Sequence, residues 1–165
     1  MHPPQPPSIP GFVLDTQRER VDLDALWRFL SEEAYWGRWR TRADVERQLA
    51  TAWRVVAAYE SSSGRMVGFS RAVSDGISVA YLADVYVERA VRGRGLGAAL
   101  VEEMIDRGPG ANLRWMLHTA DAHGMYERFG FRRPDHTYLE RPAAIRQSRS
   151  SSGQAGQTPG PRRDA

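Results

Sequence analysis

The chain has 165 residues, which fits one domain built around one hydrophobic core. All 23 of its basic residues are arginine, and it contains no cysteine. The lack of lysine excludes Schiff-base chemistry and a phosphate-loop lysine, and the lack of cysteine excludes thiolate nucleophiles and disulfides. The formal net charge is +3 and the pI is about 9.7, values that raise the question of a nucleic-acid partner.

The two ends of the chain differ in composition from its middle. Residues 1–10 include five prolines and predict a disordered leader, and residues 143–165 predict a disordered tail rich in Ser, Gly and Arg. We expect one folded domain over residues 11–142. The tail carries four arginines and one acid, so residues 12–142 hold 19 of each sign and are formally neutral. Because this domain is formally neutral, we predict no nucleic-acid partner.

Neither the leader nor any other segment resembles a targeting or membrane sequence. The leader has no positive segment followed by an apolar one, as a secretory signal would. No apolar run approaches the roughly 20 residues of a membrane span. We expect a cytoplasmic protein without a membrane partner, as a monomer or homodimer.

The periodicity of the middle predicts a mixed α/β domain. Turn residues at 61–64 and 75–76 separate three strands, which we expect to form an antiparallel meander. Thr41 and Asp44 predict a capping box, and Asp121 a helix cap. In chain order, the predicted elements are a strand at 11–17, helices at 22–34 and 41–53, strands at 54–60, 66–73 and 78–88, a helix at 95–107, a strand at 113–119, a helix at 121–129 and a last strand at 131–139.

A glycine-rich loop, Arg92-Gly93-Arg94-Gly95-Leu96-Gly97, lies between a predicted strand and a predicted helix. The first N–H groups of such a helix form a donor-rich site for phosphate oxygens. One interpretation is the dinucleotide fingerprint of an NAD(P)-dependent oxidoreductase, with Asp121 as the ribose-binding acid. Against it, residues 88–92 separate the strand from the first glycine, and too little chain follows Asp121 for the rest of that fold.

The second interpretation takes Arg92-x-x-Gly95-x-Gly97 as the unit, preceded by the strand Asp84-Val85-Tyr86-Val87. A later stretch, residues 122–131, places Tyr126 shortly before Gly130-Phe131. In these motifs the chain resembles the GNAT superfamily of acyl-CoA-dependent N-acyltransferases. The resemblance implies a single-domain α/β fold with a mixed, mostly antiparallel central sheet flanked by helices. It also implies transfer of an acetyl or short acyl group from acetyl-CoA to an amine of a small molecule or peptide.

The resemblance assigns the glycine loop to coenzyme A. The N–H groups of Gly93, Arg94, Gly95, Leu96 and Gly97 would hold the pyrophosphate, flanked by the Arg92 and Arg94 side chains. The pantetheine arm would lie along Val85, Tyr86 and Val87, where the strands at 78–88 and 113–119 splay apart. Thr119 and Arg89 stand where the family often has asparagine and proline.

Two residues are candidates for the chemistry of acyl transfer. By the resemblance, Tyr126 is the general acid that protonates the departing thiolate, and its alternative role is core packing. Asp84 interrupts an apolar strand, which indicates either a base for the acceptor amine or a structural anchor for an arginine. Strand alternation places Asp84 on one face with Leu82 and Tyr86, although a bulge would change where it points.

Trp36 lies between the two N-terminal helices, which in this family commonly line the acceptor pocket, so it is a candidate acceptor contact. Core packing explains this tryptophan equally well. The spacing of His118, Asp121 and His123 fits no zinc pattern, and we predict no metal. A GNAT-fold module that binds acyl-CoA without turnover remains the alternative from another functional class.

Overall fold

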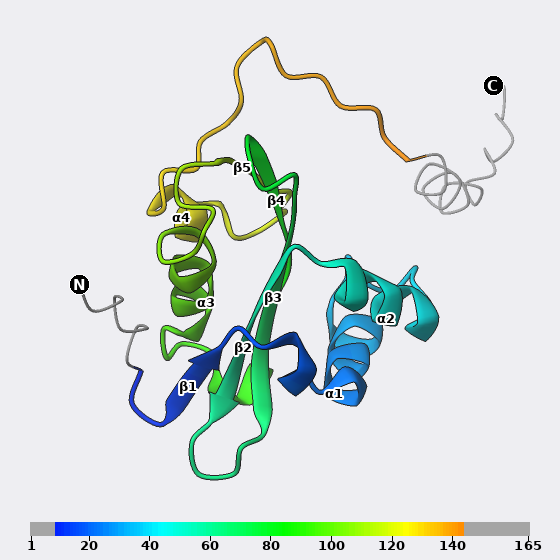
Figure 1. Ribbon diagram of the computed structural model, residues 1–165, viewed down its shortest axis with the longest axis vertical. Coiled ribbons are helices and arrows are strands. Elements are labelled where there is room, and N and C mark those ends of the chain that lie inside the picture. The colour runs from blue at the N-terminus through cyan, green and yellow to red at the C-terminus, as the bar shows by residue number, and fades with distance from the viewer. Residues whose placement is uncertain (1–8, 144–165) are drawn as a thin grey trace, which may run out of the picture. The chain divides into compact units, whose positions relative to one another are not determined.

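The computed structural model describes residues 9–143, so the predicted leader and tail lie almost entirely outside the described residues. The chain divides into two compact units, residues 1–131 and 132–165, and every described helix and strand belongs to the first (Figure 1). At the described N-terminal end, Ile9 pairs with Phe12 and packs against the core. The described residues therefore include core contacts on the N-terminal side of the boundary predicted at residue 11.

A five-stranded sheet in the order β1-β2-β3-β4-β5 forms the centre of the first unit. The strands β1 to β4 are antiparallel to their neighbours, whereas β4 and β5 are parallel. The predicted meander and the mixed, mostly antiparallel sheet are thereby confirmed. The strands are β1 (Phe12–Asp15), β2 (Arg54–Glu60), β3 (Met66–Ser74), β4 (Val79–Val87) and β5 (Arg114–Met116).

Helices cover both faces of this sheet, with α1 and α2 on one side and α3 and α4 on the other (Figure 1). The capping box predicted for α2 is present, because the Thr41 side chain accepts from the Asp44 N–H and the Asp44 side chain accepts from the Thr41 N–H. The helical segments are α1 (Leu23–Arg28), the π-helical turn η2 (Phe29–Glu33), α2 (Arg42–Thr51), α3 (Leu96–Ile105) and α4 (His123–Glu127), with short 3-10 turns η1 (Arg18–Arg20) and η3 (Arg89–Val91).

The sheet separates two hydrophobic clusters. On the α3 side, Leu100 and Met104 are fully buried against residues of the central strands such as Val56. On the α1 and α2 side, Phe29 and Phe69 are fully buried. At roughly 1.5–3 kcal/mol for each large apolar side chain buried, these two clusters supply most of the stabilisation that fixes the sheet between its helices.

A bulge in β4 changes which side chains face each cluster. Arg71 pairs with Ala83, whereas Phe69 pairs with Tyr86, so β4 carries one more residue than β3 over this stretch. Asp84 lies in the bulge with a φ of 53°, the one non-glycine residue in the described range with a positive φ. Leu82 packs in the α3 cluster, whereas Tyr86 packs in the α1 and α2 cluster. The predicted grouping of Leu82 with Asp84 and Tyr86 is wrong because the bulge interrupts strand alternation.

The C-terminal elements are shorter than predicted. Residues 131–143 contain no helix or strand, so the predicted last strand is wrong. Pro134 lacks an N–H for a ladder, and the flanking Arg132 and Arg133 are exposed. Helix α4 begins after Ala122 rather than Asp121, and the Thr119 hydroxyl accepts a hydrogen bond from the Ala122 N–H at 3.1 Å.

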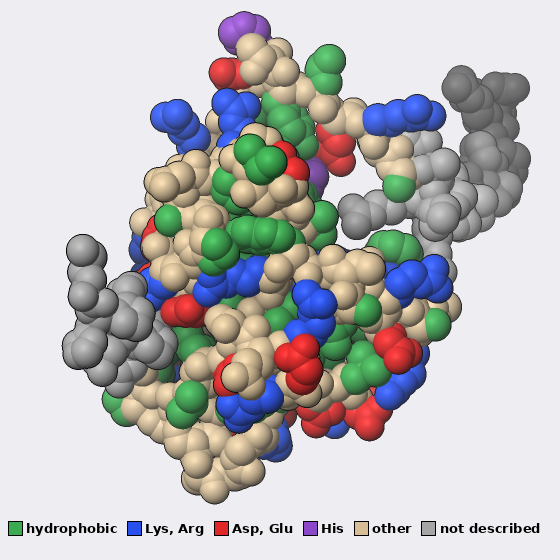
Figure 2. Space-filling view, viewed as in Figure 1, with side chains coloured by type: hydrophobic (Ala, Val, Ile, Leu, Met, Phe, Trp, Pro, Cys, Tyr) green, Lys and Arg blue, Asp and Glu red, His purple; other side chains and the backbone are tan. Residues whose placement is uncertain are grey.

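Charged side chains of both signs are interleaved over the visible face of the molecule (Figure 2). Within residues 9–143, no helix combines the length and the apolar character that crossing a bilayer requires. The same range contains no group of three metal-ligating His, Cys, Asp or Glu side chains.

Candidate active site

The edge of β4 that faces β5 is open along most of its length. β4 and β5 pair only over Val79–Arg114, Ala80–Trp115 and Tyr81–Met116. Beyond Tyr81, β4 has no strand partner on this side within the described part of the chain. The two strands therefore diverge at the place where the resemblance implies a splay, and the bulge at Asp84 lies at the beginning of the open edge.

A pocket of about 260 Å³ lies at this open edge. It brings together Trp36, Arg92 and the three β4 residues that were predicted as site residues. It also includes three residues that sequence analysis did not assign to an acceptor site: Glu33, Tyr35 and Asp121. The lining residues are Glu33, Tyr35, Trp36, Val85, Tyr86, Val87, Arg92 and Asp121.

The glycine loop adopts a conformation that only glycine accommodates easily. Gly93 and Gly95 have φ values of +77° and +84°, and a Cβ built on either would meet nothing within 4 Å. Their requirement for glycine is therefore conformational and does not arise from crowding. Gly95 is the N-cap of α3 and makes no side-chain cap, so no side chain of the cap occupies the first N–H groups of the helix.

The start of α3 lies between the open edge and α4. A Cβ at Gly97 would lie 3.9 Å from Val87 Cγ2 and 3.5 Å from Met125 Sδ. Arg92 donates from Nε to the Val87 carbonyl at 2.8 Å, whereas the Arg94 guanidinium lies 4.5 Å from the centre of the Phe12 ring. The predicted phosphate loop, the predicted pantetheine strand and the helix that carries Tyr126 therefore meet in one region.

Tyr126 is 8% exposed, and its ring packs edge-on against Phe131 at 5.7 Å between centroids. Its hydroxyl makes no hydrogen bond to any residue in the range 9–143. Burial is the largest of the effects that together raise the pKa of Tyr126 to about 12, and the charges of Asp121 and Tyr35 act in the same direction. Asp121 and Tyr35 both line the pocket, so the Tyr126 hydroxyl lies within electrostatic reach of it.

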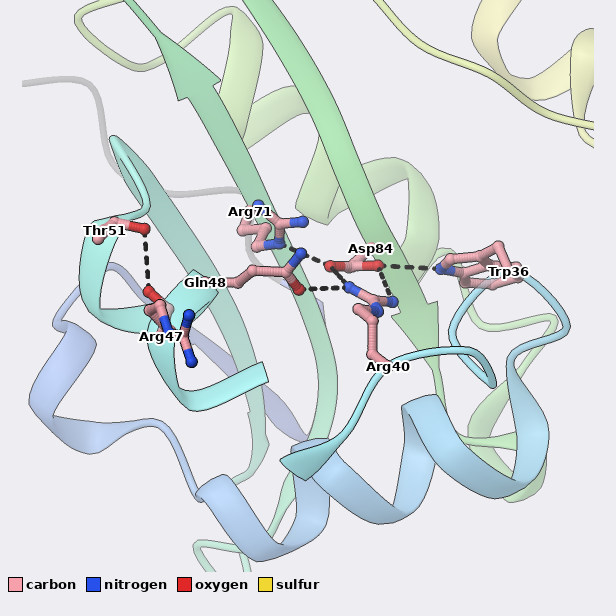
Figure 3. Close-up of polar contacts among 7 residues, drawn as sticks. All are labelled: Trp36, Arg40, Arg47, Gln48, Thr51, Arg71 and Asp84. Carbon is pink, nitrogen blue, oxygen red and sulfur yellow. Dashed lines mark hydrogen bonds and ion pairs between the residues drawn. The ribbon is translucent and has the colours of Figure 1, made fainter. Parts of the chain in front are cut away.

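Asp84 lies at the centre of a buried polar network (Figure 3). Its Oδ1 accepts hydrogen bonds from Trp36 Nε1 at 3.1 Å and from Arg40 Nη2 at 2.8 Å. Its Oδ2 accepts from Arg40 Nη1 at 2.8 Å and from Arg71 Nε at 2.6 Å. Burial by itself would raise the pKa of Asp84, but the hydrogen bond from Arg40 and the charge of Arg71 outweigh burial and lower it.

This network favours the structural anchor over the base among the two roles predicted for Asp84. A carboxylate offers about four lone-pair positions, and four donors already occupy them. No position is left to receive the proton of an acceptor amine. The network also fixes Trp36, because its indole N–H is held by Asp84 while the residue lines the pocket. Neither Arg40 nor Arg71 was singled out from the sequence.

A family model, a sequence relative and solved structures all compare this chain with acetyltransferases. A family model described as the acetyltransferase (GNAT) domain matches residues 51–133. A curated relative, "Serotonin N-acetyltransferase 2, chloroplastic" from Oryza sativa subsp. japonica, is 38% identical over 123 residues, which are 73% of this chain and 62% of that protein. The aligned part thus spans less than two-thirds of the length of that relative.

Solved structures agree with the sequence relatives. A protein from Xanthomonas campestris pv. campestris, described as belonging to the GNAT family, has a TM-score of 0.75 and 32% identity, with 82% of this chain and 96% of that chain covered. A protein from Deinococcus radiodurans R1, described as an acetyltransferase, has a TM-score of 0.61 and 28% identity over 82% and 92% of the two chains. The chain belongs to the GNAT acetyltransferase family.

Proposed function

We propose that the chain is an N-acetyltransferase that transfers the acetyl group of acetyl-CoA to the primary amine of a small molecule. The observation that carries the proposal is the pocket of about 260 Å³ at the open edge of β4. Residues proposed to bind the thioester arm, the coenzyme phosphates and the acceptor amine all line it or lie next to it. Its β4 wall has no strand partner toward β5 among residues 9–143 and could therefore pair with a thioester arm. Arg92 connects the pocket to the glycine loop, and Asp121 connects it to Tyr126.

Acetyl-CoA fits the groups that surround this pocket. The free N–H groups at the beginning of α3, including those of Leu96 and Gly97, would hold the pyrophosphate together with Gly93, Arg94 and Gly95. The Arg92 and Arg94 side chains would add positive charge beside it. The pantetheine arm would lie along Val85, Tyr86 and Val87, whose edge has no strand partner toward β5 among residues 9–143.

Tyr126 is proposed as the acid that protonates the departing thiolate. An ordinary thiol has a pKa of about 8.5. With a pKa of about 12, Tyr126 keeps its proton at physiological pH and is a weaker acid than the thiol. Its donation to the sulfur is therefore coupled to breakage of the carbon–sulfur bond and to the return of a proton from the newly acylated nitrogen. The Tyr126 hydroxyl lies near the pocket and has no hydrogen-bond partner among residues 9–143, so it is available for this role.

The lining of the pocket favours an amine that carries an aromatic or other flat apolar group. Tyr35, Trp36 and Tyr86 supply aromatic surface. Glu33 and Asp121 supply negative charge, which attracts a cationic amine. The relative named serotonin N-acetyltransferase is named for an aromatic amine of this class, which supports the choice of probe.

The test is isothermal titration calorimetry with acetyl-CoA, coenzyme A and NAD, followed by thiol-release assays with a panel of amines. We expect binding of acetyl-CoA and coenzyme A, and faster turnover of arylalkylamines than of amino acids, whose carboxylate would face Glu33 and Asp121. Binding of NAD alone would overturn the proposal. Tight binding of acetyl-CoA without thiol release from any amine would instead identify an acyl-CoA sensor.

A further inference from the structure

The pocket contains two carboxylates, Glu33 and Asp121, to which the proposed function gives no part in proton transfer. Acetylation needs a neutral amine, so one group has to accept a proton from the ammonium form of the acceptor. Asp84 has no free lone-pair position for it. We propose that Glu33, held by the Tyr86 hydroxyl, is the group that binds the acceptor ammonium and takes its proton; this inference rests on the proposed function.

The Glu33 carboxylate is held at one oxygen only. Tyr86 Oη donates a hydrogen bond to Glu33 Oε2 at 2.6 Å. Glu33 Oε1 has no hydrogen-bond partner within residues 9–143, which leaves it available for an amine. Glu33 lines the pocket but is also exposed, so a proton taken from the substrate can pass on to bulk water.

Tyr86 fixes the position of that carboxylate. Tyr86 is 3% exposed, and its ring stacks on Phe29 with 4.3 Å between centroids and an interplanar angle of 24°. Phe29 and Glu33 are the first and last residues of η2, so the stack and the hydrogen bond attach β4 to both ends of that turn. The carboxylate is therefore placed against the same strand that is proposed to hold the thioester arm.

Asp121 is better suited to a different task. It lies on the segment between β5 and α4, and its negative charge raises the pKa of Tyr126. The negative charge of Asp121 thus favours the protonated form of Tyr126. The two carboxylates therefore have different proposed roles: Asp121 acts on Tyr126, and Glu33, held between η2 and β4, acts on the acceptor amine.

Glu33, Tyr126 and solvent water together account for every proton that moves in the complete reaction. The acceptor ammonium gives one proton to Glu33 Oε1, which leaves a neutral amine with a lone pair. The amine nitrogen forms a bond to the acetyl carbon as the carbon–sulfur bond breaks, and Tyr126 donates its proton to the sulfur. The tyrosinate recovers a proton from the amide nitrogen, and Glu33 releases its proton to water. The products are the N-acetylated amine, coenzyme A and one proton.

The experiment compares Glu33→Gln with Glu32→Gln in the full chain. The amide introduced by Glu33→Gln keeps an oxygen that can accept from Tyr86, so the change removes the charge and preserves the shape. Glu32 is the exposed neighbour and does not line the pocket, which makes it the matched control. We expect Glu33→Gln to lower kcat/KM at neutral pH by about 100-fold or more, and Glu32→Gln to leave it unchanged. The affinity for acetyl-CoA, measured by calorimetry, should be the same in both.

A pH series separates proton transfer from a structural role. The titratable or charged groups that face Glu33 across the pocket are Tyr35, Tyr86, Arg92 and Asp121. Below the pKa of a typical alkylamine, about 10.4, the free-amine fraction rises about tenfold for each pH unit. Activity of Glu33→Gln should rise with that fraction more steeply than activity of the wild type. Tyr126, with a pKa of about 12, remains protonated over this range.

The outcomes are distinguishable from failure of the proposed function. If the wild type releases no thiol with any amine, the proposed function fails and the inference fails with it. If the wild type is active and Glu33→Gln matches Glu32→Gln, only the inference is overturned. Loss of activity in Asp121→Asn with an intact Glu33→Gln would likewise overturn it, because the proton acceptor would then be Asp121.

Discussion

At Asp84, the fold places a single carboxylate between two buried arginines, Arg40 and Arg71. The three side chains carry a net positive charge inside the protein, and the backbone at Asp84 is held in the left-handed region. Aspartate and asparagine tolerate that region better than other non-glycine residues. The residue thus serves both the bulge and the loop that carries Trp36, which explains why a charged side chain interrupts an apolar strand.

Replacing Asp84 with asparagine should cost much stability. Asparagine preserves the left-handed backbone but leaves Arg40 and Arg71 buried without a counter-charge, a loss of about 3–5 kcal/mol in the free energy of unfolding. The control is Asp24→Asn, because the ion pair of Asp24 with Arg42 is exposed and should contribute less than about 1 kcal/mol. Urea unfolding measures both; equal stabilities of the two variants would contradict the anchor role.

Asp84 also determines how the free energy of unfolding should change in acid. The pKa of Asp84 is lowered in the folded protein, so its contribution to stability is complete above the unfolded-state pKa of about 3.9. That contribution is lost as the pH falls through the lower folded-state pKa. Wild-type stability should therefore fall more steeply in acid than that of Asp84→Asn.

Tyr126 allows a residue-scale test of the acid. Phenylalanine keeps the ring contact with Phe131 and removes only the hydroxyl. We expect Tyr126→Phe to lower kcat by about 100-fold or more, with the acetyl-CoA affinity unchanged within about twofold, and Tyr138→Phe, outside the pocket, to behave as wild type. Steady-state kinetics and calorimetry give both values. Turnover in Tyr126→Phe equal to that of the wild type would remove this residue from the mechanism.

At the scale of elements, the glycine loop can be tested apart from its conformational strain. Gly95 and Gly64 have φ values of +84° and +69°, and a Cβ would meet nothing within 4 Å at either. Alanine at either position should therefore cost a similar amount of stability, about 1 kcal/mol. Only Gly95→Ala should also weaken acetyl-CoA binding, because Gly64 lies in the turn between β2 and β3. Equal affinities in calorimetry would contradict the phosphate role of the loop.

Local patterns predicted most of the elements. The capping box at Thr41, the turn at Gly64 and the glycine loop depend on residues close together in the chain, so the sequence contains their causes. The parallel pairing of β5 with the beginning of β4 was not predicted as such, although a strand–helix–strand order is typical of it. The predicted strand at 131–139 fails because strand-like composition does not supply a partner edge.

Long-range contacts explain what the sequence did not predict. The side chain of Asp84 in the β4 bulge is held by Arg40 and Arg71, which are 44 and 13 residues away in the sequence. A bulge was expected to redirect Asp84, but no pattern in the sequence indicates that β4 contains one. Glu33 has the pattern of an ordinary helix-surface acid, whereas in the structure it lines the pocket and accepts a hydrogen bond from Tyr86, 53 residues away.

For the whole molecule, the charge distribution is the one expected of the proposed action on a small-molecule amine. The net charge of +3 comes from the last residues of the chain, and the rest is formally neutral. The visible face of the molecule shows both signs interleaved (Figure 2). The arginines that matter for the proposed function are those around the glycine loop, next to a pocket whose own lining contains two carboxylates.

The most direct test of the proposed function follows both products of the full-length wild-type protein. Acetyl-CoA and an arylalkylamine are incubated with the protein, thiol is measured by a colorimetric reagent, and the N-acetylated amine is quantified by mass spectrometry. We predict that thiol and N-acetylated amine form in equal amounts and that neither forms without the amine. Thiol release without an acetylated amine, or no release with any amine tested, would contradict acetyl transfer by this protein.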